Sequence, residues 1–429
     1  MTSNHQITDL NILTEILPVF NYTNNPFAEQ VLSELLIQPL PSIAHIGERQ
    51  QILKGFVKNY PFLKSYNYSR AAFAEVYQFI QTQDRPFSGS SIFTSKAQKR
   101  EQQVLMNAYA QFVLFFEELL RKWITMINLS VFPGTYKAAL ETIHQQLTDF
   151  DLPYYAGLIN EQQFGEKAVK QLSAKVIARK QDGGWQRFWP VFFRFEAYTS
   201  ISLAVVRKGF AFPALGTGPI AIRDLYHPLL NEPVKNDIVL AKNVGLLTGP
   251  NMAGKSTLLK AIGLCVFLAH TGVAVPASAA EIPFFDHIAV FINHRDDLQN
   301  GYSHFMYEIK NLKHLILEAA AGKRCFAVFD ELFKGTNSAD ALAITCSTLE
   351  GMHRFEDSCF FVSTHLHELK TQPVVTSNTV HVLHIDCIIE NGSPRFTYKL
   401  EDGWSDLKIG RLLFEAEGLY ELLRKHSSS

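Results

Sequence analysis

A phosphate-binding loop pattern is the feature that most constrains how this chain can fold. Residues 249–256 read Gly-Pro-Asn-Met-Ala-Gly-Lys-Ser, which matches the pattern G-x-x-x-x-G-K-[ST]. The apolar run 244–247 before the loop is typical of a buried strand, and an apolar helical pattern follows through about His270. Strand, loop and helix thus occur in the order that the pattern requires, which predicts a P-loop α/β fold with a mostly parallel sheet.

The chemistry of this loop predicts ATP and Mg²⁺ as ligands. Gly249 and Gly254 let the backbone curl so that its N–H groups face phosphate oxygens, and the helix N-terminus adds its positive dipole end. We expect Lys255 to reach the β- and γ-phosphates and the hydroxyl of Ser256 to ligate Mg²⁺. The remaining nucleotide-binding candidates of the loop are Pro250, Asn251, Met252, Ala253 and Thr257.

Two carboxylates follow the apolar strand predicted at Cys325–Phe329. In parallel sheets of this kind the carboxyl ends of the strands face the ligand. Asp330 is therefore expected to hold Mg²⁺, directly or through water. Glu331 is expected to orient or deprotonate the attacking water.

A further apolar strand, predicted at Cys359–Ser363, leads into Thr364 and His365. His365 is a candidate for sensing the γ-phosphate through a hydrogen bond, and His367 competes for the same role. The polar loop 296–308 contains Ser303, which the pattern alone predicts to be an ordinary helix N-cap.

The chain is expected to have two domains. Residues 1–215 show mainly helical periodicity, and residues 216–429 alternate strands with helices after a break rich in proline and glycine. Other strands are predicted at 220–223 and 287–292, and Asn391-Gly392 predicts a hairpin between 381–389 and 395–400. A last helix at about 407–425 has a leucine stripe that could close the domain, which we favour, or pack on a partner.

Composition restricts the class of protein. The chain is 47% hydrophobic with a net charge of −1, so it has a real core and no overall nucleic-acid signature. Its apolar runs near residues 104–132 are interrupted by charges, so no membrane span is expected. The start of the chain lacks the features of a signal peptide, and the five cysteines form no C-x-x-C pair. We therefore expect a cytoplasmic protein.

One segment of the helical half is locally basic. Only Asp182 and Glu196 oppose a run of nine cations there: Lys167, Lys170, Lys175, Arg179, Lys180, Arg187, Arg194, Arg207 and Lys208. This stripe is compatible with contacts to a DNA backbone and equally with a solvated helix surface.

Taken together, these motifs resemble the MutS family of mismatch-repair ATPases. The resemblance rests on the loop 248–257, the loop 296–308, Asp330-Glu331 with Gly335-Thr336-Asn337, and Ser363-Thr364-His365. Tyr226-His227-Pro228 is similar to the family's segment beside the adenine, which makes Tyr226 and His227 nucleotide-binding candidates. The likeness is strong over 220–429 and weaker from about residue 30, where it suggests the family's helical core and lever domain.

The resemblance implies an ABC-type P-loop ATPase that works as a homodimer through its ATPase domain. Ser303 would contact the γ-phosphate held by the partner's loop, and Asn251 would help to read the nucleotide state. His365 would be the switch histidine, and Asp340 would lie in the loop that crosses the dimer interface.

The sequence also departs from the family pattern. The core-domain likeness begins too early to leave room for the domain with the mismatch-reading Phe-x-Glu wedge, and the helical half is too short for a full clamp. Phe333-Lys334 stands where family members usually have Gly-Arg, which affects the expected loop but not the carboxylates.

These features predict a MutS-like DNA-repair or DNA-maintenance ATPase that binds double-stranded DNA through its backbone, without direct mismatch reading. One alternative is a MutS-like regulatory ATPase that acts through a protein partner, such as another repair protein, without binding DNA. A second is the ATPase subunit of an ABC transporter, against which the missing membrane span and LSGGQ-type sequence argue.

Overall fold

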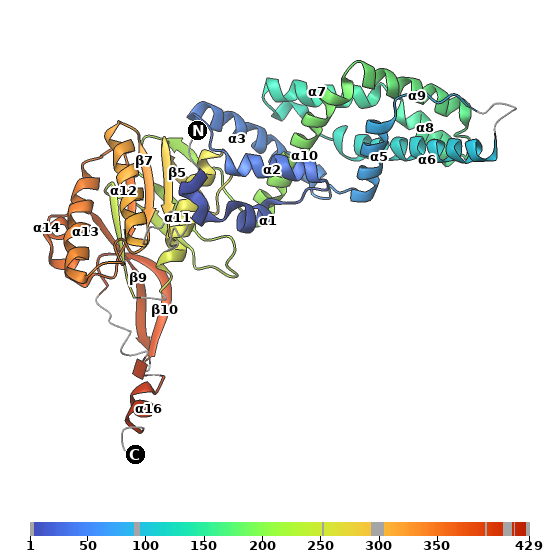
Figure 1. The fold of residues 1–429 in the computed structure, drawn as a ribbon. Helices are drawn as coiled ribbons and strands as arrows, with labels where there is room; N and C mark the ends of the chain where they lie inside the picture. Colours follow the sequence, from blue (N-terminus) through green and yellow to red (C-terminus); the bar gives the residue numbers. More distant parts are fainter. Residues whose placement is uncertain are drawn as a thin grey trace. The chain divides into compact units, whose positions relative to one another are not determined.

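The computed structural model describes residues 4–89, 95–250, 253–292, 304–390, 393–405, 414–415 and 417–425. Figure 1 shows the course of the chain. The chain forms two compact units. The α/β unit contains Met1–Val19, Ile37–Gly47 and Lys208–Ser429, and the helical unit contains Phe20–Leu36 and Glu48–Arg207.

The unit formed by Phe20–Leu36 and Glu48–Arg207 is built from α-helices, as the spacing of its apolar residues predicted. Its main elements are α2 (Pro26–Ile37), α3 (Ile43–Lys58), α4 (Tyr60–Leu63), α5 (Arg70–Thr82), α6 (Lys96–Leu119), α7 (Gly134–Thr148), α8 (Leu152–Asn160), α9 (Glu166–Gln181) and α10 (Gly184–Lys208). Aromatic side chains of α10 recur three and four residues apart and are buried: Trp185, Phe188, Trp189 and Phe192. This spacing puts them on one helix face, where they build the core. None of the described helices is long and apolar enough to cross a membrane.

A buried carboxylate joins three segments of the helical unit. Glu196 on α10 is 1% exposed. It accepts hydrogen bonds from the backbone N–H of Asn24, the side-chain amide of Asn25 (3.1 Å) and the hydroxyls of Tyr66 (3.2 Å) and Tyr68. Burial raises the pKa of Glu196, and these hydrogen bonds oppose the rise. The carboxylate therefore pins the segments that precede α2 and α5 to α10.

The larger sheet of the α/β unit has the strand order β10-β9-β4-β8-β7-β6. Its strands are β4 (Val244–Thr248), β6 (His287–Phe291), β7 (Cys325–Phe329), β8 (Cys359–Ser363), β9 (His381–Glu390) and β10 (Ser393–Asp402). All neighbouring pairs are parallel except β9 and β10, which form an antiparallel hairpin. The structure thus confirms the mostly parallel sheet and the terminal hairpin.

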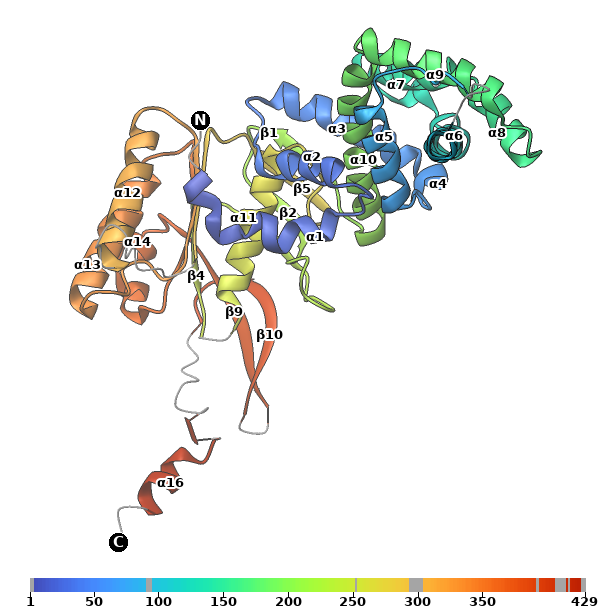
Figure 2. The ribbon, with the colours of Figure 1, turned by 45° about the vertical axis from the view of Figure 1, so that its right-hand side comes forward.

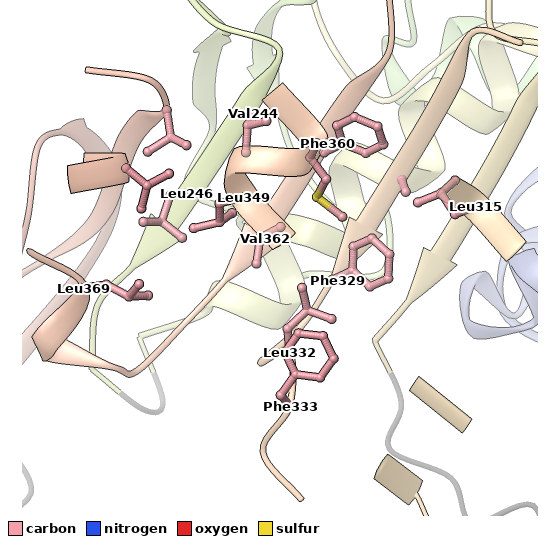
Figure 3. Packing of buried hydrophobic residues seen from close by; sticks show 14 of the residues in the cluster. Val244, Leu246, Leu315, Phe329, Leu332, Phe333, Leu349, Phe360, Val362 and Leu369 are labelled. Carbon is pink, nitrogen blue, oxygen red and sulfur yellow. The ribbon is translucent and has the colours of Figure 1, made fainter. Parts of the chain in front are cut away.

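Helices cover both faces of this sheet. α12 (His304–Ala320), α13 (Ser338–His353) and α14 (Pro373–Thr376) lie on one side, and α11 (Lys255–His270) lies on the other (Figure 2). Every residue of β4, β7 and β8 is buried, as expected for strands packed on both faces. Figure 3 shows the core on the α13 side, where Val244, Leu246, Phe360 and Val362 meet Leu349.

A second, four-stranded sheet has the order β1-β5-β2-β3. It consists of β1 (Ala214–Gly216), β2 (Ala221–Leu225), β3 (Asn236–Val239) and β5 (Ala279–Pro283). The sequence predicted only the strand at 220–223, which corresponds to β2. The other three strands are short, and β3 alternates buried and exposed residues around a charged Asp237, so no apolar run marks them.

The N-terminal segment belongs to the α/β unit. The Asp9 carboxylate of η1 (Asn4–Leu10) accepts a hydrogen bond from the backbone N–H of Ile292 at 2.8 Å. Glu15 pairs with Lys260 of α11 at 3.3 Å. The predicted division at residue 215 instead assigns this segment to the helical part, because nothing local in the sequence shows these distant contacts.

The end of the chain differs from the favoured expectation for the last helix. α16 spans Leu419–Lys425, and its Leu422 and Leu423 are 55% and 64% exposed. Leu412 and Leu413 of the predicted stripe lie outside the described residues. The expectation that this helix closes the domain is therefore wrong for its described part, whose leucines face solvent.

Candidate functional site

The predicted phosphate-binding loop lies at the carboxyl end of β4, directly before α11. Gly249 and Gly254 have φ angles of +132° and +97°, which glycine adopts without strain. Gly254 is the N-cap of α11, so the helix N-terminus opens into the loop. Ala253 is buried, Pro250 lies at the start of the loop, and Asn251 and Met252 lie outside the described residues.

Lys255 folds back across this loop. Its Nζ donates hydrogen bonds to the carbonyl oxygens of Gly249 (2.8 Å) and Pro250 (3.1 Å), and the residue is 5% exposed. Burial lowers the pKa of Lys255, while the negative charges of Glu331 and Asp330 oppose this change. The ammonium is thus held at the loop, beside the two carboxylates that follow β7.

Three strand ends converge on the carboxylate of Asp330. Ser256, which follows the β4 loop, donates its hydroxyl hydrogen to one carboxylate oxygen. Ser363, at the end of β8, donates to the other. The hydroxyl of Ser256 and the carboxylate of Asp330 are the hard oxygen ligands that Mg²⁺ prefers, so the donor set fits this ion. Thr257 follows Ser256 in the first turn of α11 and is exposed.

Glu331 lies next to this cluster in an unusual backbone conformation, with φ +54°. Its N–H donates to the Ser363 hydroxyl at 2.9 Å, and its carboxylate pairs with Lys334 at 2.7 Å. Burial alone would raise the pKa of Glu331, but the hydrogen bond and charge of Lys334, with His365 and Lys255, outweigh it and lower the pKa. Glu331 is therefore an ionised acceptor at neutral pH.

Of the two histidines considered for the γ-phosphate, the structure brings His365 close to the carboxylates. Its Nδ1 lies 3.9 Å from a Glu331 carboxylate oxygen, and its side chain is 49% exposed. His367 begins the short helix η5 (His367–Thr371) and is exposed. Among the described histidines, His365 is the one placed within ion-pair distance of Glu331.

Several other candidates are not joined to the loop by a described contact. The Tyr226 hydroxyl donates to the Lys208 carbonyl at 3.0 Å, and His227 is buried, with a pKa lowered by its burial and by Lys260. Asp340 lies in the first turn of α13, hydrogen-bonded by Asn337. Ser303 lies outside the described residues. The roles of these residues stay predictions.

The sequence analysis missed Tyr398, which lies against the phosphate loop. A Cβ atom placed on Gly254 would be 3.4 Å from the Tyr398 ring. Tyr398 has φ +56° within an irregularity of β10 between Phe396 and Leu400, and it is 47% exposed. Asn236 of β3 holds its carbonyl at 3.0 Å. No local pattern indicates this contact, because it depends on a register shift between β9 and β10 and on the hydrogen bond from Asn236 of the distant strand β3.

A second group of potential metal ligands lies on the β9–β10 hairpin. His384, Asp386 and Glu401 bring ligand atoms within 4.8 Å of one another. Asp386 already accepts a hydrogen bond from Thr397 at 3.1 Å, and the Glu401 side chain is 59% exposed. We assign no metal to this group.

Arg179, Lys180 and Arg187 of the predicted basic stripe form ion pairs within the helical unit. Arg179 pairs with Asp149 at 2.8 Å, and Lys180 pairs with Asp84 at 2.8 Å. Arg187 lies 3.6 Å from Asp182. Asp149 and Asp182 follow the ends of α7 and α9, and Asp84 follows α5, so part of the positive charge of the stripe is offset within the unit.

Comparisons with known proteins match the segment of the chain that contains these residues. Residues 245–419 match the family model described as MutS domain V. The DNA mismatch repair protein MutS of Bacillus cereus (strain B4264) is 33% identical over 305 residues, which cover 67% of this chain and 34% of that protein. MutS of Lactococcus lactis subsp. cremoris (strain SK11) is 32% identical over 238 residues, or 53% of this chain and 28% of that protein.

The chain spans about a third of the length of these curated relatives. The family model begins within β4 and runs through the phosphate loop, the Asp330-Glu331 pair and the β9–β10 hairpin. The α/β unit therefore contains a MutS domain V, and the chain belongs to the MutS family.

Proposed function

We propose that the α/β unit binds ATP with Mg²⁺ and hydrolyses it, as the nucleotide-driven part of a MutS-like DNA-repair protein with an ABC-type P-loop fold. The observation that carries this proposal is the convergence on Asp330 of two hydroxyls, that of Ser256 in the first turn of α11 and that of Ser363 at the end of β8. Lys255 and Glu331 lie beside that carboxylate, so the start of α11 and the turn after β7 together supply a cation, two metal-ligand candidates and a general base.

Each residue has a role in this reaction. The backbone of the loop and the ammonium of Lys255 bind the phosphates and offset the charge that develops on them. Ser256 and Asp330 would hold Mg²⁺, which when bound neutralises phosphate charge. Glu331, ionised at neutral pH, orients the attacking water and accepts its proton. Tyr398 and His365 lie at the edge of the same site, where they would contact the nucleotide.

ATP turnover by purified protein and two variants tests this proposal. Lys255→Ala should lose nucleotide binding or turnover. Glu331→Gln should keep binding and slow hydrolysis by about 10²–10⁴-fold. Asp357→Asn serves as the control, because Asp357 is 79% exposed and pairs with Arg324, just before β7, at the opposite end of that strand from Asp330. Wild-type turnover in Glu331→Gln would contradict the assignment of the base.

The names of the relatives support a DNA role, which we also propose for this chain. A homodimer formed through the ATPase unit would grip double-stranded DNA by its backbone. Binding should then weaken steeply with salt, because phosphate contacts release counterions. Fluorescence anisotropy with a homoduplex, a G·T mismatch and a branched junction at low and moderate salt measures this, and equal affinities for all three would indicate backbone recognition without mismatch reading.

The ion pairs of the helical unit favour a second candidate, a regulatory ATPase that works through a protein partner without DNA. Arg179 and Lys180, two of the expected DNA-contacting cations, are held by Asp149 and Asp84. Under this alternative the ATPase rate stays the same with every DNA, and no DNA binds at low salt. DNA-dependent turnover would exclude it.

A further inference from the structure

The turn that follows β7 has two non-glycine residues in the left-handed backbone region. Glu331 has φ +54° and Phe333 has φ +63°. Side chains with a Cβ rarely adopt this conformation, and it persists only where the surroundings impose it. The turn carries the proposed catalytic base, so whatever holds the turn also determines where the Glu331 carboxylate points.

The side chain of Phe333 provides one restraint. Its ring is fully buried in the core on the α13 side of the sheet, together with Leu332 (Figure 3). It also packs edge-on against Phe305 of α12, with ring centroids 6.1 Å apart. A Cβ on Gly335 would lie 3.2 Å from the Phe305 Cβ, so the chain leaving the turn runs directly against the first turns of α12.

The backbone of the turn is held from the same helix. The N–H of Phe333 donates to the carboxylate of Glu308 on α12 at 3.2 Å. Burial raises the pKa of Glu308 to about 7, with the hydrogen bond from Phe333 opposing the rise. A carboxylate in such surroundings is unfavourable unless it is hydrogen-bonded. On the other side of the turn, Ser363 holds the Glu331 N–H at 2.9 Å.

We propose that Glu308 is a positioning residue that fixes the turn of Glu331 from α12. The inference rests on the proposed ATPase function. Glu308 acts through the Phe333 backbone and needs no contact with the nucleotide. Because Glu308 joins α12 to the turn through the Phe333 N–H, a shift of the start of α12 would move the turn that carries Glu331.

Two substitutions at position 308 separate this role from a general contribution to folding. Glu308→Gln keeps a carbonyl oxygen that accepts the Phe333 N–H, whereas Glu308→Leu has a similar size and no acceptor. Glu318→Gln is the matched control, because Glu318 lies near the other end of α12 and pairs with Lys323. For each protein, kcat, the Kd for ATP and the amide hydrogen exchange of a peptide spanning 330–336 are measured.

We expect Glu308→Leu to lower kcat at least tenfold and to leave the Kd for ATP unchanged. The amide hydrogens of residues 330–336 should exchange faster in this variant than in wild type. Glu308→Gln should stay within threefold of wild type in all three measurements, as should the control. Wild-type kcat in Glu308→Leu overturns the proposal, and so does an equal loss of ATP binding and kcat, which indicates a collapsed site. If the wild-type protein itself shows no turnover, the proposed function fails and this inference fails with it.

Discussion

Ser363 donates its hydroxyl hydrogen to the carboxylate of Asp330 and accepts the backbone N–H of Glu331 at 2.9 Å. One side chain at the end of β8 therefore fixes both acidic residues at the end of β7. Ser363 is fully buried, so neither partner can replace it with water. This relationship leads to the first prediction.

Ser363→Ala should weaken both folding and turnover. It leaves a buried carboxylate oxygen and a backbone N–H without their partner, which costs about 1–3 kcal/mol of unfolding free energy. If about 1.4 kcal/mol of this affects the geometry of the transition state, kcat falls about tenfold. Urea unfolding and steady-state ATPase rates measure the two effects. Ser347→Ala, on α13 with its hydroxyl bonded only to the Ala343 carbonyl, should change neither.

Gly254→Ala should disable the phosphate loop. At φ +97° a Cβ strains the backbone, and it would also come into van der Waals contact with the Tyr398 ring at 3.4 Å. We expect a loss of stability of about 1–3 kcal/mol, typical of a non-glycine residue forced into this region, and a weaker affinity for a fluorescent ATP analogue. Gly351→Ala is the control, since a Cβ there meets no atom within 4 Å in helix α13. It should be neutral or stabilising, because alanine is the better helix former. Equal behaviour of the two variants would contradict the strained geometry at Gly254.

The dependence of stability on pH should report on Glu308. Burial raises its pKa from 4.5 to about 7 in the folded protein. The folded state then binds more protons than the unfolded state between these values, so this stabilising contribution is present below pH 4.5 and lost as the pH rises through 7. The glutamine of Glu308→Gln cannot ionise. The melting temperature of this variant minus that of wild type should therefore increase from pH 5 to pH 8. If the melting temperatures of the two proteins change in parallel across this pH range, the Glu308 carboxyl has an ordinary pKa.

Glu196→Ala should destabilise the helical unit strongly. The change removes the acceptor of four donors, including the buried hydroxyls of Tyr66 and Tyr68. Each buried donor that is left without an acceptor costs about 1–3 kcal/mol of unfolding free energy. Thermal melting of the full chain measures this loss of stability. Glu141→Ala is the control, because the Glu141 side chain is half-exposed and its described ion pair, with Lys137, is long at 3.7 Å. If the Glu196→Ala protein melts like the control, the network is not important for stability.

Much of the α/β unit could be predicted because its strands are buried on both faces. β7 and β8 have the bounds expected from the apolar runs Cys325–Phe329 and Cys359–Ser363. The polar residues after them were expected at one edge of the sheet, and the structure brings Asp330, Glu331 and Ser363 together there. In these two strands the local pattern of apolar residues and the tertiary arrangement agree, so each short run predicted both a strand and the edge of the sheet where it ends.

What could not be predicted depends on contacts between distant parts of the chain. Glu308 looks like one of many helical acids, and its partner is the backbone of Phe333, whose left-handed conformation no sequence pattern reveals. Tyr398 reaches the phosphate loop only because β10 is irregular next to Asn236. The basic run on α9 and α10 left a DNA-binding surface and a solvated helix surface equally open, because two of its acidic partners, Asp84 and Asp149, lie elsewhere in the sequence.

The position of the N-terminal segment affects how the protein can be made. Leu10 and Ile16 are buried in the α/β unit, and Asp9 bonds to Ile292. During synthesis these residues leave the ribosome long before β6 exists, and the whole helical unit emerges in between. The helical unit can form as soon as its own residues are available, whereas the α/β unit must wait for most of the chain and close a long loop, which is a slow step. The proposed nucleotide site, which lies in the α/β unit, is therefore among the last parts of the chain to assemble.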